Sequence, residues 1–93
     1  MIRPMELKEL RDRLDVIDKE LEEQFAARMQ VVRAIGEYKK RCGIATFDAA
    51  REAQVLAMHT DGQSEEIKPY MEEFFKAVMD ISKEYQDSGS KDL

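Results

Sequence analysis

The sequence predicts an all-α fold of three helices, assembled as an intertwined antiparallel homodimer. An amphipathic helical pattern runs without a break from about residue 6 to 41, and two shorter helical patterns follow it, separated by turn signals. The first pattern is also too long for one copy of the chain to cover, and this observation predicts the second copy.

The first helix is expected at about residues 6–41, because its apolar residues are spaced three and four apart and no glycine occurs before Gly36. A helix of roughly 36 residues would be about 54 Å long. A compact chain of 93 residues should be only about 32 Å across. The apolar stripe therefore extends beyond what the rest of the chain can cover, and a homodimer would bury it. The stripe comprises Leu7, Leu10, Leu14, Ile17, Leu21, Phe25, Val31 or Val32, and Ile35.

Two shorter helices are expected at about residues 48–59 and 67–87. Gly43 is typical of a helix end, and Asp48 can serve as the N-cap of the second helix. The third helix has an apolar side, and the polar segment 88–93 that follows it should be a flexible tail. The whole chain is expected to form a single domain.

Composition limits the classes of partner. A net charge of -5 and a pI near 4.9 argue against nucleic acid or an anionic membrane as the main partner. The chain has no apolar run long enough to span a membrane and no targeting segment, so we expect a cytoplasmic protein. One cysteine, Cys42, and one histidine, His59, can make neither an internal disulfide nor a metal site.

Three cations lie on or beside the apolar stripe of the first helix, where cations are unusual. Arg28 and Lys39 are eleven positions apart, so they share one helix face at a separation of roughly 16 Å and can converge on one small anion. Arg11 is about 25 Å from Arg28 along the axis. If two antiparallel copies cross near residue 22, Arg11 of one chain lies opposite residue 33 of the other. This arrangement predicts two equivalent sites per dimer, each completed by the partner chain.

The later helices carry two further polar groups. Arg51 and Glu52 fall in the first turn of the second helix, in directions that become apolar one turn later. Ser82 and Gln86 are four positions apart and therefore neighbours on the third helix. Taken alone, Arg51 and Glu52 are more typical of an exposed ion pair than of a binding site. Ser82 and Gln86, taken alone, fit a solvent-facing side of the helix equally well.

Together these positions resemble the all-helical class of chorismate mutases, over most of the chain from about Leu7 to Gln86. The resemblance rests on eight polar positions whose order and spacing match. It is carried by the segments 10–18, 27–29, 35–39, 48–52 and 79–86.

The resemblance implies how the two carboxylates of the substrate, chorismate, are held. Arg11 would come from the partner chain and act together with Arg28 and Arg51, with Ser82 assisting at one carboxylate. A planar guanidinium fork suits this task because it can bond a carboxylate at two points.

The resemblance also implies the groups that act on the rest of the substrate. Lys39 and Gln86 would donate to the ether oxygen of the breaking bond, while Glu52 and the backbone at Asp48 would bind the ring hydroxyl. The rearrangement to prephenate is intramolecular and pericyclic, so it requires no cofactor, metal or nucleophile. Because no further domain is visible, we expect a monofunctional enzyme.

Two other functions fit part of this pattern. An isochorismate-pyruvate lyase of the same fold would look alike at Arg11, Arg28, Lys39 and Gln86, whereas Glu52 favours the mutase because it can accept a bond from a ring hydroxyl. A non-catalytic helical dimerisation or regulatory module is the other alternative. It gives no reason for cations on the apolar stripe, because burying them without a ligand costs several kcal/mol per charge.

Overall fold

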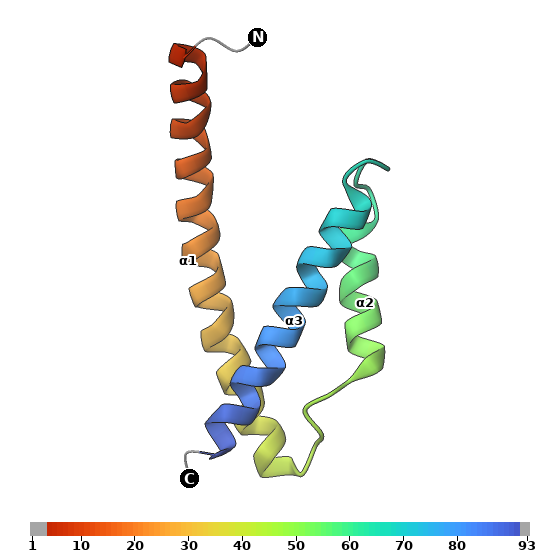
Figure 1. Ribbon diagram of the computed structural model, residues 1–93. Helices are drawn as coiled ribbons and strands as arrows, with labels where there is room; N and C mark the ends of the chain where they lie inside the picture. Colours follow the sequence, from red (N-terminus) through yellow and green to blue (C-terminus); the bar gives the residue numbers. More distant parts are fainter. Residues whose placement is uncertain (1–3, 92–93) are drawn as a thin grey trace. The chain divides into compact units, whose positions relative to one another are not determined.

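The computed structural model describes residues 4–91, with side chains for 6–88, and three helices make up its regular structure (Figure 1). No strand occurs within 4–91. The predicted all-α fold of three helices is therefore confirmed. The described chain forms two compact units that divide between Val31 and Val32. They are called here the N-terminal unit and the C-terminal unit. The helices are α1 (Pro4–Cys42), α2 (Ala49–Thr60) and α3 (Lys68–Lys91).

The N-terminal unit consists of the first part of α1. Proline suits the first position of a helix, where its missing N–H would have no partner within the helix, and α1 begins at Pro4. The apolar stripe of this unit is open, because Leu10 is 45% exposed, Leu14 53% and Leu21 50%. No described residue of the N-terminal unit covers these side chains, and their burial by a second copy remains a prediction.

Helix α1 ends where the sequence predicts. Gly43 follows its last residue with a φ of 67°, a left-handed conformation that glycine adopts without steric cost. The N–H of Ile44 then donates to the carbonyl oxygen of Lys39 at 2.8 Å. This bond satisfies one of the carbonyl groups that a helix end leaves without a partner.

Helix α2 begins at the predicted cap. The Asp48 backbone is extended, and its Oδ1 accepts a bond from the N–H of Arg51 at 3.0 Å. At the other end, the N–H of Asp61 donates to the Ala57 carbonyl oxygen at 3.0 Å. Gly62 follows with a φ of 84°, a left-handed conformation that glycine adopts without steric cost in the turn after α2.

The core of the C-terminal unit lies between α2 and α3, which run side by side (Figure 1). Val55 of α2 is buried, as are Val78 and Met79 of α3. The ring of His59 stacks on that of Phe75 with their centroids 4.4 Å apart, which extends the contact towards the turn. This small core packs the middle of α2 against the middle of α3.

Helix α3 is longer than predicted. It continues through Lys91, beyond the predicted end near residue 87, so residues 88–91 of the expected tail are helical, whereas 92–93 lie outside the described chain. Ser88 Oγ donates to the carbonyl oxygen of Tyr85 at 3.1 Å. The polar composition of this segment therefore does not prevent it from being helical.

No helix within residues 4–91 combines the length and the apolar composition that are needed to cross a membrane.

Candidate active site

The eight predicted site residues are divided between the two units. Arg11 and Arg28 belong to the N-terminal unit, in which Arg11 is exposed and Arg28 is half-buried. The C-terminal unit carries the others, which are Lys39, Asp48, Arg51, Glu52, Ser82 and Gln86.

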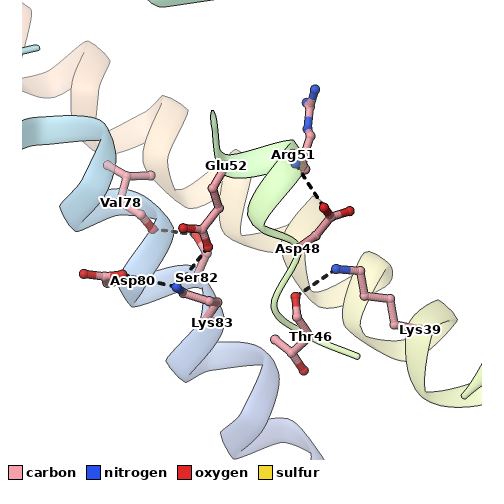
Figure 2. A network of polar contacts seen from close by, with 9 residues as sticks. All are labelled: Lys39, Thr46, Asp48, Arg51, Glu52, Val78, Asp80, Ser82 and Lys83. Atoms are coloured by element: carbon pink, nitrogen blue, oxygen red, sulfur yellow. Dashed lines mark hydrogen bonds and ion pairs between the residues drawn. The ribbon is translucent and has the colours of Figure 1, made fainter. Parts of the chain in front are cut away.

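Lys39 is held by the segment that follows α1. Its Nζ donates to the carbonyl oxygen of Thr46 at 2.9 Å, and the side chain is half-buried (Figure 2). Thr46 Oγ1 in turn donates to Oδ1 of Asp87 at 3.2 Å, which ties this segment to α3 beside Gln86. An ammonium group has three donors, so the bond to Thr46 fixes Lys39 and still leaves it able to donate to a ligand.

Gln86 packs against the end of α1. A Cβ atom at Gly36 would lie only 3.1 Å from the Cγ of Gln86, so the absence of a side chain at Gly36 makes room for this glutamine. Gln86 Oε1 is buried and has no hydrogen-bond partner among the described residues. A buried polar atom in this state costs about 1–3 kcal/mol. A hydrogen bond from a ligand or a second chain would therefore be favourable here.

The first turn of α2 carries two predicted residues with different local bonds. The carboxylate of Asp48 caps the helix, and its carbonyl oxygen accepts from the N–H of Glu52 at 3.0 Å. The guanidinium of Arg51 is exposed, and its Nη1 donates to Oε1 of Gln54 at 2.7 Å. Four of the five guanidinium N–H donors are not used by that bond, so Arg51 can still hold a carboxylate.

Glu52 forms an ion pair with a residue that the sequence analysis did not single out. Its Oε2 lies 2.9 Å from Nζ of Lys83, and the two side chains are 26% and 29% exposed (Figure 2). The alternative of an exposed pair between Glu52 and its neighbour Arg51 is therefore not what the structure shows. The hydrogen bond to Glu52 raises the pKa of Lys83 above its usual value, against a smaller lowering by burial.

Lys83 could have been found from its spacing. It follows Met79 by four positions, so it lies on the same side of α3 as a buried residue. A cation beside an apolar stripe is the signal that identified Arg11, Arg28 and Lys39 on the first helix.

Ser82 is the most deeply buried of the predicted residues, with 6% exposure. Its Oγ donates to the carbonyl oxygen of Val78 at 2.6 Å, one turn earlier in α3 (Figure 2). A hydroxyl group has a single donor. Ser82 must therefore give up its bond to Val78, by turning its hydroxyl hydrogen, before it can donate to a substrate carboxylate.

Comparison with known proteins identifies the family. Residues 10–87 match the family described as chorismate mutase type II. The chain belongs to the type II chorismate mutase family. It is also 42% identical over 52 residues to a protein named T-protein from Enterobacter agglomerans, an alignment that covers 56% of this chain and 14% of that relative. The chain thus matches only a small part of the relative's length.

The chemistry available at the site is compatible with a type II chorismate mutase. Lys39 and Gln86 offer hydrogen-bond donors, Glu52 offers an acceptor, and Arg51 offers a second positive charge. Within residues 4–91, no group of three or more His, Cys, Asp or Glu side chains is arranged to hold a metal ion. The site can therefore orient a polar anion and stabilise charge that develops on it.

Proposed function

We propose that the chain catalyses the rearrangement of chorismate to prephenate. The observation that carries this proposal is the family match over residues 10–87, a range that contains all eight candidate site residues. In this reaction the ether C–O bond breaks and a C–C bond forms within one molecule, so no proton donor, nucleophile or cofactor takes part. The task of the protein is to hold the flexible dianion in a compact conformer and to stabilise charge on the ether oxygen.

Lys39 and Gln86 act on the ether oxygen. As the C–O bond lengthens, negative charge accumulates on this oxygen, and a donor that is already fixed in place stabilises it without further reorganisation. The bond from Lys39 Nζ to the Thr46 carbonyl oxygen, at 2.9 Å, supports such preorganisation. The Gln86 amide donates at any ordinary pH, because it does not titrate.

The carboxylates of the dianion are bound by arginines. Arg28 and Arg51 come from the same chain, Arg11 comes from the partner chain, and Ser82 assists after turning its hydroxyl hydrogen away from Val78. The exposed position of the Arg51 guanidinium and its single bond to a neutral glutamine side chain support its part in this set.

Glu52 accepts a hydrogen bond from the ring hydroxyl, beside the backbone of Asp48. An ionised carboxylate is an acceptor only, so it recognises a hydroxyl group in the orientation that chorismate presents. Its half-buried carboxylate, already bonded to Lys83, supports this role, because an ionised group in that position needs a positive partner. This acceptor favours the mutase over the isochorismate-pyruvate lyase.

The active form is an antiparallel homodimer in which each chain supplies Arg11 to the site of the other. The open apolar stripe supports this assembly. Leu14 is 53% exposed and Ile17 is also 53% exposed, which leaves a row of apolar side chains that a second copy can bury.

Product analysis tests the proposed activity. The purified chain is incubated with chorismate, and in parallel with isochorismate under a pyruvate assay. We expect prephenate from chorismate. Pyruvate from isochorismate without comparable mutase activity would replace this proposal with the lyase, and inertness toward both substrates would support the non-catalytic module instead.

Mixing inactive variants tests the shared site. An Arg11→Ala chain and an Arg28→Ala chain are each expected to be nearly inactive as homodimers. In a heterodimer, one of the two sites combines the Arg11→Ala and Arg28→Ala defects, and the other site is intact. Mixing after reversible unfolding should therefore restore activity, whereas absence of any recovery would rule out the cross-chain role of Arg11. Wild-type chain taken through the same unfolding step is the control.

A further inference from the structure

The ion pair between Glu52 and Lys83 differs in kind from ion pairs such as Lys76–Glu72. That pair joins residues one turn apart on α3, at 3.0 Å, and its lysine side chain is 58% exposed. Glu52 and Lys83 instead join the first turn of α2 to α3, and both side chains are less than one third exposed. The contact therefore fixes the position of the Glu52 carboxylate relative to α3.

The ammonium of Lys83 is itself held from three sides. Glu52 from α2 lies nearest, at 2.9 Å, while Oδ1 of Asp80 on α3 lies at 3.4 Å. The ring of Phe47, from the segment before α2, has its centroid 4.8 Å from Nζ, within the range of a cation–π contact. Lys83 is thus a fixed charge, with Glu52 as its closest partner.

We propose that Lys83 is a positioning residue for Glu52. It orients the carboxylate toward the ring hydroxyl and offsets the repulsion between that carboxylate and a dianionic substrate. The inference rests on the proposed function. A carboxylate has two oxygens, each with two acceptor sites. A carboxylate bonded to Lys83 through Oε2 therefore keeps the capacity to accept from the substrate.

The carboxylate of Glu52 and the substrate carry charges of the same sign. Chorismate brings two carboxylates to a site that already contains the negative charge of Glu52. Without a nearby cation, the negative charge of Glu52 would repel both substrate carboxylates and oppose binding, most strongly where water is excluded. Lys83 supplies a compensating charge without itself needing to touch the substrate.

Four variants separate this role from a structural one. Lys83→Met removes the charge and keeps an unbranched apolar side chain against Phe47, whereas Lys83→Arg keeps the charge. Glu52→Gln removes the carboxylate charge, alone and together with Lys83→Met. Lys76→Met serves as the matched control, because it removes a paired lysine from the same helix. The kcat and KM for chorismate are measured for each, with far-UV circular dichroism to verify folding.

The expected result is a selective rise in KM. Lys83→Met should raise KM about fivefold, the size of effect that a modest ion pair exerts, with a smaller change in kcat. Lys83→Arg should restore most of the loss, and Lys76→Met should match the wild type. In the Glu52→Gln background, Lys83→Met should raise KM no further, because no uncompensated carboxylate remains.

Three outcomes would overturn the proposal. The first is a KM for Lys83→Met equal to that of Lys76→Met. The second is the same fold-change in the presence and absence of the Glu52 carboxylate, which would indicate a purely structural effect. The third is a wild-type chain that leaves chorismate unchanged, and this result alone would refute the proposed function together with the inference. If Lys83→Met does not fold, Lys83→Gln takes its place in the same comparison.

Discussion

Substituting Gly36 by alanine should reduce catalysis while leaving the fold stable. Gly36 lies in α1, and a Cβ atom built on it would be 3.1 Å from Cγ of Gln86, 3.4 Å from its Cβ and 3.6 Å from its Cδ. The nearest of these distances is shorter than ordinary van der Waals contact, so Gln86 must move by a few tenths of an ångström. Because the side chain is unbranched, it can move without disturbing the backbone.

The substitution should change kcat and folding stability by different amounts. Misplacing a reacting group by about 1 Å costs about a hundredfold in rate, so a shift of a few tenths of an ångström at Gln86 should lower kcat roughly tenfold. The folding stability should change little, because two contributions to it cancel. Alanine is favoured over glycine inside a helix by about 1 kcal/mol, which offsets an overpacking cost of about the same size. The midpoint of thermal unfolding should therefore change by only a few degrees.

Steady-state kinetics with chorismate and thermal unfolding followed by circular dichroism test this expectation. Ala34→Gly is a suitable control, because it changes helix propensity at an exposed position of α1. It should lower stability and leave kcat unchanged. A Gly36→Ala enzyme with wild-type kcat would refute the reasoning. An equal loss of kcat in a Gln86→Ala background would also refute it, because the effect is argued to act through Gln86.

Five further predictions follow from the same structure. Lys39→Met should lower kcat by about a hundredfold to a thousandfold without unfolding the chain; near-normal turnover would exclude Lys39 from the reaction. Asp48→Ala should cost about 1 kcal/mol of folding free energy through loss of the cap, as measured by urea unfolding. Met79→Ala should cost about 2–5 kcal/mol in the same assay, and a smaller loss would show that the core is less tightly packed. Activity in steady-state assays should stay level from about pH 6 to 8, because the Gln86 amide does not titrate. The raised pKa of Lys83 means that its ion pair contributes stability fully below the usual value near 10.5, and that this contribution is lost as the pH rises through the higher value in the folded chain. The difference in thermal stability between wild type and Lys83→Met should therefore narrow as the pH rises beyond the usual lysine value of 10.5.

The sequence was most informative where local chemistry decides the structure. The helix stop at Gly43 and the cap at Asp48 depend on residues within one turn, and the structure has both. The end of α3 was set too early, because polar composition alone does not distinguish a frayed tail from an exposed last turn whose Ser88 hydroxyl bonds back to Tyr85.

Contacts between distant residues could not be predicted in the same way. The approach of Gly36 to Gln86 and the bond from Thr46 to Asp87 depend on how α3 packs, and no periodic pattern encodes them. Lys83 is an intermediate case. Its spacing from Met79 placed it beside the core, but only the packed helices show that its partner is the carboxylate of Glu52.

The connection between α1 and α2 has a consequence for insertions and deletions. Lys39 is bonded twice by this segment, at its carbonyl oxygen by the N–H of Ile44 and at its ammonium by the carbonyl oxygen of Thr46. Surface loops usually tolerate added residues, because their ends move little when the loop grows. Here an added residue between Ile44 and Thr46 would leave the helix end in place while carrying the second acceptor away. Such a chain would keep its three helices and lose the fixed orientation of one ammonium group.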